Sequence, residues 1–248
     1  MERLVASPCS APDWTLPEVL AAHAELDFMK FEAFISWVKS ALDVTADPIT
    51  YVEMAGRYGM RYTSMHLPPV GDDLDESLAG AIRAARFARQ LGADVVLFKA
   101  TSRPNYVRAA PVFLDAIAGL GLTAVIQNHC GSPLNDVDDV IEVLRGVGDE
   151  RLKVLLEVGH FHQAGVTWDR AYERLRGKVA LVHVKDISAG KPVPFGAGEI
   201  DFASLASALE ADGYEGDYVV ELEGEECRAD PLRYLREAVD FLLPLIEE

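Results

Sequence analysis

Short apolar runs that end in a polar or charged side chain recur along the chain. They are DFMKFE ending at Glu32, RYTSMH at His66, VVLFK at Lys99, TAVIQNH at Gln127 and His129, KVLLEVGH at Glu157 and His160, LVHVKD at His183 to Asp186, and DYVVELE at Glu221 to Glu223. A strand buried on both faces is a continuous Val, Ile and Leu run, so these runs predict parallel strands. Since the carboxyl ends of parallel strands meet at one edge, we expect the polar side chains to gather there.

Amphipathic stretches separate the apolar runs and predict helices. They cover residues 16–26, 49–58, 75–91, 106–120, 133–144, 168–175, 202–209 and 231–246. Thr15, Thr167 and Asp201 stand directly before three of them, where N-caps are expected. With LVASP at the start as a further strand, the chain alternates strand and helix eight times, which indicates parallel pairing with right-handed crossovers.

Eight such units in 248 residues predict a single closed (β/α)8 TIM barrel over residues 1–248. A doubly wound open sheet usually has fewer units and a glycine-rich first turn. Here the first turn is SPCSAPDW, and neither a G-x-G-x-x-G nor a phosphate-binding G-x-x-x-x-G-K-[ST] string is present. No linker or change in composition marks a domain boundary.

Composition and charge restrict the classes of partner. The chain is 50% hydrophobic, so a large core is expected, and its net charge of −17 disfavours DNA or RNA. No apolar stretch reaches the length of a membrane span, and MERLVASPCS has no secretory signal, so we expect a cytoplasmic protein without membrane contact. Cys9, Cys130 and Cys227 form no CxxC pair, which disfavours a disulfide framework and a structural zinc site.

Strand alternation groups the polar residues further. Side chains two positions apart point to the same side of a strand. This rule pairs Gln127 with His129, His183 with Lys185, and Glu221 with Glu223.

If these sides face the barrel interior, one amide, two carboxylates and one imidazole meet at the mouth on four successive strands. The residues are Gln127, Glu157, His183 and Glu221. Oxygen and nitrogen ligands of this kind suit Mn²⁺, Mg²⁺, Zn²⁺ or Fe²⁺. We therefore predict a site for one divalent metal ion, with Lys185 close enough to donate to a substrate oxygen.

At these residues the chain resembles the xylose isomerase-like TIM-barrel superfamily, specifically its sugar phosphate isomerase/epimerase group. The matching strings are Q-N-H (127–129), E-V-G-H (157–160), H-V-K-D (183–186), P-F-G-A-G-E-I-D-F (194–202) and G-Y-E-G-D-Y-V-V-E-L-E (213–223). The resemblance implies one divalent cation held by Glu, Asp, His and Glu at the ends of the last four strands. Those positions fall on Gln127, Glu157, His183 and Glu221. It also implies a substrate contact for His160, and the less similar amino-terminal half adds Glu32, His66 and Lys99 as pocket candidates.

Two residues depart from the family pattern. In the family's epimerases the first and last glutamates are also the two proton-transferring bases, and Gln127 occupies the first of these positions. An amide oxygen binds a cation but does not take a proton from carbon near neutral pH, so a two-carboxylate epimerisation is disfavoured. Glu157 replaces the usual Asp and moves the carboxylate outward by about one C–C bond, on the order of 1.5 Å.

One carboxylate base then remains at Glu221, with His129 as acid or relay and Lys185 as a donor to substrate. A metal that polarises a carbonyl or hydroxyl acidifies the neighbouring C–H bond. We therefore predict a metal-dependent isomerase or epimerase that transfers a proton at carbon of a small sugar or polyol derivative. A lyase or dehydratase of a keto-sugar at the same site is the alternative.

Two further alternatives remain at this level. The Gln127 substitution also suits a catalytically retired sugar-binding barrel or a subunit of a complex. The abasic-site endonucleases of the superfamily are similar at E-V-G-H, but their three-zinc cluster needs more ligands than the 6 histidines here readily supply. A homo-oligomer is expected from the family resemblance.

Overall fold

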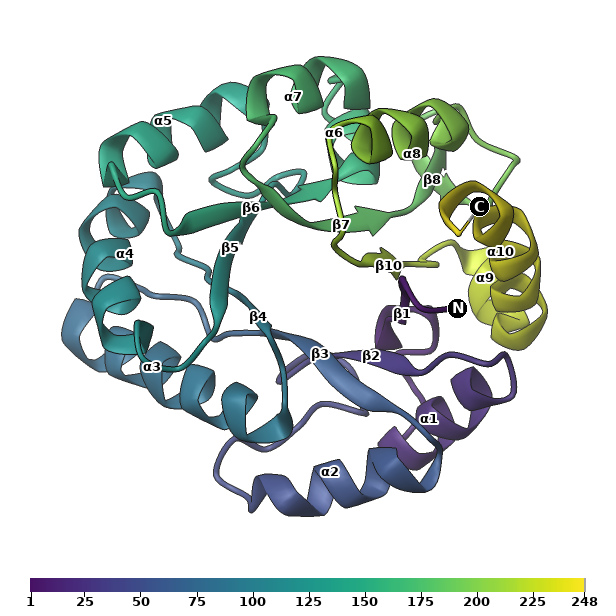
Figure 1. Cartoon of the computed structure of the whole chain (residues 1–248), viewed down its shortest axis with the longest axis horizontal. Coiled ribbons are helices and arrows are strands. Elements are labelled where there is room, and N and C mark those ends of the chain that lie inside the picture. The colour runs from purple at the N-terminus through teal and green to yellow at the C-terminus, as the bar shows by residue number, and fades with distance from the viewer. Residues whose placement is uncertain (248) are drawn as a thin grey trace.

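The computed structural model describes residues 1–247 and contains one closed parallel barrel ringed by helices (Figure 1). Around the barrel the strands follow the order β1-β10-β7-β6-β5-β4-β3-β2. Their bounds are β1 Leu4–Ala6, β2 Lys30–Ala33, β3 Arg61–His66, β4 Val95–Leu97, β5 Thr123–Gln127, β6 Leu152–Glu157, β7 Val179–Val184 and β10 Tyr218–Val220. The predicted (β/α)8 barrel is confirmed.

Helices cover the outside of the barrel and follow the strands in sequence. They are α1 Leu16–Ala24, α2 Pro48–Arg57, α3 Leu74–Leu91, α4 Arg103–Ile117, α5 Val137–Val147, α6 Val158–Gln163, α7 Trp168–Leu175, α8 Phe202–Ala211, α9 Glu225–Ala229 and α10 Pro231–Ile246, with the short 3-10 helix η1 at Pro8–Ser10. Helices α7 and α10 begin and end at the predicted residues. The start of α5 was predicted too early, because Asp136 caps it and forms a capping box with Asp139.

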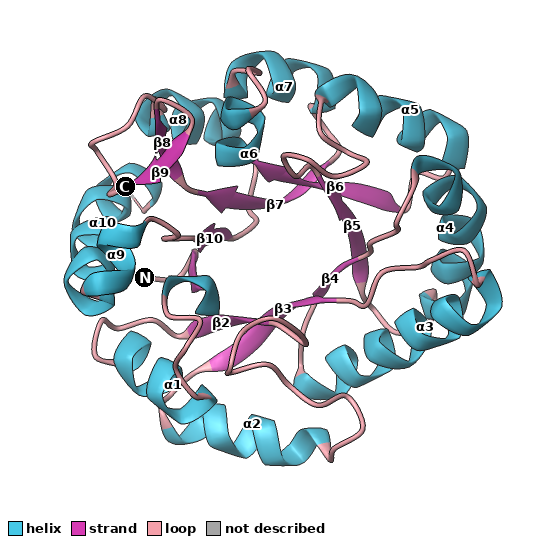
Figure 2. Cartoon of the chain, turned by 180° about the vertical axis from the view of Figure 1, so that it is seen from behind, coloured by secondary structure: helices cyan, strands magenta, loops and turns pink. Residues whose placement is uncertain are grey.

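Three elements near the mouth were not predicted. Helix α6 follows β6 without a loop, and β8 (Asp186–Ser188) forms an antiparallel hairpin with β9 (Lys191–Val193). The third is the short helix α9, which begins at Glu225 and lies between β10 and α10. Figure 2 shows the hairpin and the loops that follow the strands on the side of the barrel where the strands end.

The barrel interior is filled by a layer of apolar side chains that point inward. The layer consists of Val5, Leu97, Val125, Leu155, Leu181 and Val219, all almost completely buried. A larger hydrophobic cluster fills the space between barrel and helices. Two residues beyond members of the inner layer stand Lys99, Gln127, Glu157, His183 and Glu221, so strand alternation places these side chains in the next layer, at the mouth.

Asp186 anchors the segment that follows the hairpin. Its carboxylate accepts hydrogen bonds from the backbone N–H groups of Gly196 (2.9 Å), Gly198 (3.0 Å) and Ile187 (2.9 Å). The space beside it is too small for a side chain at residue 198, because a Cβ atom there would lie 1.9 Å from the Asp186 Oδ1. The family-like string at 194–202 is therefore bound to Asp186, the last residue of the H-V-K-D string (183–186).

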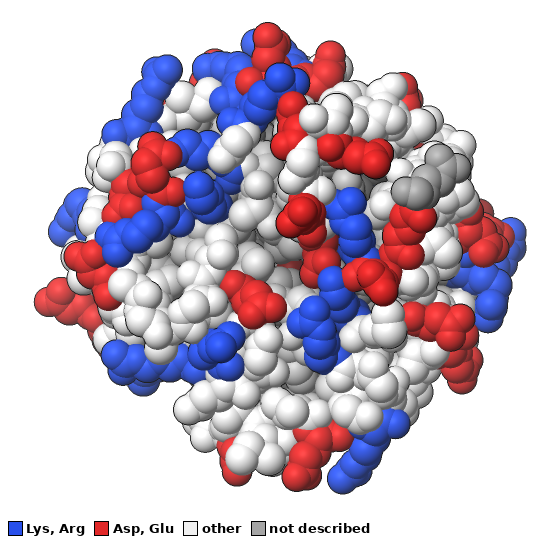
Figure 3. Space-filling model, in the orientation of Figure 1, with Lys and Arg blue, Asp and Glu red and all other residues white. Residues whose placement is uncertain are grey.

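The face at the amino ends of the strands carries acidic and basic side chains interspersed (Figure 3). Among residues 1–247, no helix is both long and apolar enough to cross a membrane.

We expect the substitution Gly198→Ala to destabilise the protein. The new methyl group would collide with the Asp186 carboxylate, and overpacking of this kind costs about 1–3 kcal/mol. Gly119→Ala is the matched control, because a Cβ there meets nothing within 4 Å. The free energy of unfolding from denaturant titration measures both. Equal stabilities of the two variants would contradict this packing argument.

Candidate active site

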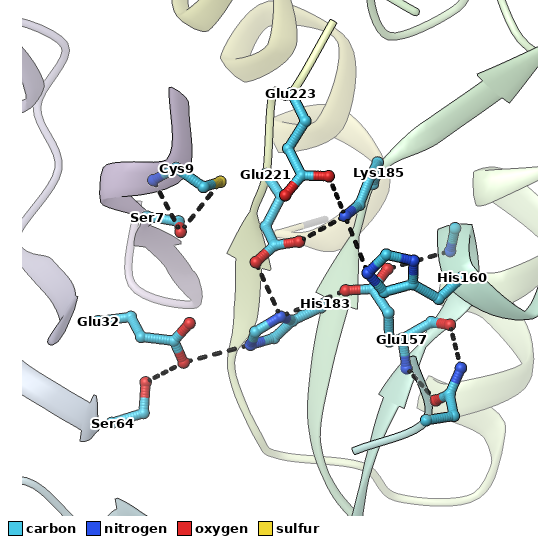
Figure 4. A network of polar contacts seen from close by, with 12 residues as sticks. Ser7, Cys9, Glu32, Ser64, Glu157, His160, His183, Lys185, Glu221 and Glu223 are labelled. Carbon is cyan, nitrogen blue, oxygen red and sulfur yellow. Dashed lines mark hydrogen bonds and ion pairs between the residues drawn. The ribbon is translucent and has the colours of Figure 1, made fainter. Parts of the chain in front are cut away.

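His183 lies at the centre of the mouth, completely buried, with carboxylates on both sides of its ring (Figure 4). Its Nε2 is 3.2 Å from the Glu32 Oε2, and the pair is a hydrogen bond across the barrel. Burial alone would lower the pKa of His183, but the Glu32 and Glu221 carboxylates outweigh burial and raise the pKa well above its ordinary value. The interaction fixes the orientation of the ring.

The other ring nitrogen faces a small group of possible metal ligands. Nδ1 of His183 is 3.3 Å from the Glu157 Oε2 and 3.2 Å from the Glu221 Oε1. Both Nδ1 and the Glu157 Oε2 are buried and lack a hydrogen-bond partner among residues 1–247. Ligand atoms of all three residues lie within 4.8 Å of one another, which is compact enough for one ion.

A cross-strand amide orients Glu157, and the sequence analysis did not single it out. The Asn128 side chain accepts from the Glu157 backbone N–H (3.0 Å) and donates to the Glu157 carbonyl oxygen (2.9 Å). The Gly159 backbone N–H donates to the Glu157 Oε1 at 3.1 Å, so the other carboxylate oxygen is left facing His183. The Asn of the Q-N-H string could have indicated this contact, because the amide of a buried Asn needs hydrogen-bond partners.

Gln127 ends β5, beside Leu155 of β6, and its side chain is half-buried. Its amide makes no hydrogen bond to another described residue. The barrel order places β5, β6, β7 and β10 next to one another, so the four predicted metal ligands stand on adjacent strands. The structure brings Glu157, His183 and Glu221 together directly, and a role for Gln127 as fourth ligand stays a prediction.

Lys185 occupies the other side of Glu221. Its buried ammonium contacts the Glu221 Oε2 at 2.9 Å and the Glu223 Oε2 at 2.6 Å. Burial opposes the charge on Lys185, but the carboxylates, Glu221 foremost, raise its pKa well above the ordinary value. Although burial favours the neutral acid, Lys185 and His183 lower the pKa of Glu221 well below its usual range. The predicted base is therefore held ionised.

The side of the mouth formed by β2, β3 and β4 carries a second polar group. His66 donates from Nε2 to the Glu32 Oε1 (3.0 Å) and accepts at Nδ1 from the Lys99 ammonium (2.7 Å). Burial, with Lys99 next in importance, lowers the pKa of His66 to about 4 and keeps its ring neutral at physiological pH. Ser64 donates to the Glu32 Oε2 at 2.7 Å.

Glu32 is completely buried, and both of its carboxylate oxygens are hydrogen-bonded to side chains of the protein, namely Ser64, His66 and His183. The sequence analysis took it as a pocket candidate, and a substrate contact of Glu32 stays a prediction. Its position behind His183 is one from which a carboxylate can fix the tautomer and direction of the imidazole. Substrate contacts of His66 and Lys99 stay predictions.

His160 and His129 lie next to the possible metal ligands. Their ring centroids are 3.8 Å apart. The Lys185 ammonium donates a hydrogen bond to the His160 Nε2 at 3.4 Å. Burial lowers the pKa of His160 to about 4, so its ring is neutral near pH 7. His129 is exposed at the edge of the site, and its ring hydrogen-bonds only to the Cys130 carbonyl oxygen among described groups.

The chain is similar in sequence to curated proteins. A curated relative, inosose dehydratase from Mesomycoplasma hyopneumoniae (strain 7448), is 24% identical over 216 residues, covering 70% of this chain and 72% of the relative.

Solved structures share the fold at lower sequence identity. The IolI protein with a bound zinc atom superposes with a TM-score of 0.79 at 15% identity, covering 99% of this chain and 100% of that one. A D-allulose 3-epimerase from Methylomonas sp. has a TM-score of 0.79 at 16% identity, covering 98% and 97%. The family described as xylose isomerase-like TIM barrel matches residues 20–245, and with its closed barrel the chain belongs to that family.

Proposed function

We propose that the chain is a metal-assisted lyase that removes water from a polyhydroxylated ketone, either a keto-sugar or a keto-cyclitol. The supporting observation is the arrangement around His183. The Nδ1 of His183 and the Oε2 of Glu157 are buried and lack a hydrogen-bond partner among residues 1–247. Nδ1 also faces Glu221, the carboxylate of this group that contacts the Lys185 ammonium. This arrangement provides one metal position and one base.

The donor set fits a divalent ion. Glu157, His183 and Glu221 would hold it, with the Gln127 amide oxygen as a further ligand, and the unpartnered Nδ1 and Oε2 atoms are the groups that such an ion would satisfy. A bound Mn²⁺, Mg²⁺, Zn²⁺ or Fe²⁺ would polarise the substrate carbonyl and stabilise the enolate formed next to it. The zinc reported for the IolI protein supports the presence of a metal.

Protein side chains then transfer the proton. Glu221 takes it from the carbon beside the carbonyl, while Lys185 donates a hydrogen bond to a substrate oxygen. The C–H electron pair forms the new double bond as the C–O bond at the next carbon breaks. Glu221 returns the proton to the departing hydroxyl, which leaves as water, so one base serves both steps.

The choice of lyase over epimerase depends on residue 127. Inversion at carbon uses a base on each face of the substrate, and the amide of Gln127 does not accept a proton at neutral pH. Elimination on one face uses Glu221 alone. The curated relative named inosose dehydratase supports the same reaction class, with a keto-cyclitol as substrate.

A one-base aldose–ketose isomerisation is the second candidate. It starts with the same proton abstraction, but Glu221 returns the proton to the neighbouring carbon and no water is lost. Product analysis distinguishes the two, because only the lyase forms an unsaturated product. The small carbohydrate substrate is common to both.

Replacing the base should abolish turnover. We expect Glu221→Gln to lower kcat about 10²–10⁴-fold at saturating metal, the usual contribution of a general base. The matched control is Glu223→Gln, because Glu223 contacts Lys185 but is not one of the ligands around His183. Steady-state assays with metal content determined in parallel measure both variants. Full activity of Glu221→Gln would eliminate this base from the mechanism.

Metal affinity should fall as pH decreases. The raised pKa of His183 means that the metal-free imidazole holds a proton to higher pH than an ordinary histidine, and an incoming ion must displace it. Affinity should rise by up to about tenfold per pH unit until the pH exceeds this raised pKa. Calorimetry in buffers of different ionisation enthalpy, from about pH 6 to about pH 8, counts the released protons. Metal uptake without proton release would contradict the assigned ligand.

Restoring the carboxylate at residue 127 should strengthen metal binding. Gln127→Glu adds a charged ligand and a second base, so we expect metal affinity to increase on the order of tenfold. We also expect epimerised substrate to appear. Gln163→Glu is the control, because Gln163 bonds to His160 rather than facing the ligands. Unchanged metal affinity in Gln127→Glu would place residue 127 outside the metal site.

A further inference from the structure

The loop between β2 and α2 holds a tryptophan in a strained backbone conformation. Trp37 has a φ of 55°, in the left-handed region that bulky residues rarely adopt. The Val38 backbone N–H donates to the Ser36 carbonyl oxygen at 2.8 Å, closing a three-residue turn around Trp37. The indole is 58% exposed, so burial does not compensate for the strain.

Both sides of the turn are fixed by the surrounding structure. The Lys39 N–H donates to the Pro12 carbonyl oxygen at 2.7 Å, and the Leu42 N–H donates to the Phe34 carbonyl oxygen at 2.8 Å. Val38 and Leu42 are buried. The loop is therefore anchored around an exposed indole, and strain maintained in this way is typical of ligand-binding positions.

Aromatic contacts connect Trp37 to the site. Its ring meets the buried Phe34 edge-on, with centroids 5.5 Å apart. Phe34 stacks on His66 at 4.0 Å, and the His66 ring lies 6.2 Å from that of His183. The indole thus stands at the rim, on the side of the mouth opposite the β5 and β6 ligands.

The other exposed large apolar side chains lie on outer helices or before a strand. Ile49 and Val52 are on α2, Val112 on α4, Phe241 on α10, and Met29 directly before β2. Trp37 differs in lying in a loop after a strand end and in its aromatic contacts towards His66.

We propose that Trp37 is a stacking platform for the C–H face of a closed-ring substrate, so that the site selects ring-shaped polyols over open chains. A ring with hydroxyls around its edge presents a continuous apolar face to the indole, while those hydroxyls reach polar groups such as Lys99 and Lys185. An open chain has no such face. The substrate assignment rests on the proposed function, but the ring preference is measurable without turnover.

Binding of two matched polyols to the metal-loaded protein tests the proposal. An inositol and an open-chain hexitol have the same numbers of carbons and hydroxyls, and calorimetry gives the ratio of their dissociation constants. We expect wild type to prefer the inositol, Trp37→Ala to lose roughly three- to tenfold of that preference, and Trp37→Phe to keep most of it. Trp168→Phe, on α7, is the control and should behave as wild type.

Fluorescence provides a readout that does not need the alanine variant to fold. The chain has 3 tryptophans, so Trp14→Phe combined with Trp168→Phe leaves Trp37 as the single reporter. Inositol should change its emission and the hexitol should not.

Three results would overturn the proposal: equal binding of both polyols by wild type, an unchanged preference in folded Trp37→Ala, or silent Trp37 emission on binding. A change of sedimentation mass in Trp37→Ala with an intact ring preference would instead assign the indole to contact between copies. None of these results bears on the base assignment, which the Glu221→Gln assay tests separately.

Discussion

The hydrogen bond between Glu32 and His183 is the contact on which the site depends. It joins β2 and β7, residues separated by 151 positions in sequence, across the interior of a closed barrel. With the Nε2 proton directed at Glu32, loss of the second ring proton leaves the Nδ1 lone pair facing the slot between Glu157 and Glu221. Three carboxylates around one buried ring carry more negative charge than the imidazole offsets. A cation bound in this slot, as proposed, would offset the excess.

The fold supplies the site through strand alternation. The inner apolar layer stops one side chain below the mouth, and the next inward position on each of five strands is polar: Lys99, Gln127, Glu157, His183 and Glu221. The hydrophobic layer fixes the height of these groups and keeps water from entering below them. Their direction is then set by local contacts, such as the Asn128 amide on the Glu157 backbone and the ammonium of Lys185 on Glu221.

The sequence predicted the barrel and the gathering of polar side chains at its mouth, because both follow from a period of two along buried strands. It did not reveal what depends on distant contacts. The pairing of Glu32 with His183 leaves no local pattern, and a register shift between Phe31 and Glu32 alters the regular alternation on β2. Helix α6 escaped detection because Val158–Gln163 is too short for helical periodicity, and the β8–β9 hairpin because its strands have three residues each. Trp37 carried no sequence signal, since its backbone strain exists only in the folded loop.

Gln127 and Lys185 act on the chemistry in the same direction. Gln127 has an amide where the family pattern has a carboxylate, and Lys185 brings an ammonium group next to Glu221. Both residues therefore make the site less negative. Lys185 also lowers the pKa of Glu221, and a carboxylate with a low pKa is a weak acceptor for a proton on carbon. Such a base succeeds only where the C–H bond is strongly acidified, as beside a polarised ketone. The same low pKa helps the second half of an elimination, because protonated Glu221 readily gives its proton to the departing hydroxyl. The electrostatics of these side chains therefore support the proposed elimination, while the amide at residue 127, rather than the acidity of Glu221, separates it from a two-base epimerisation.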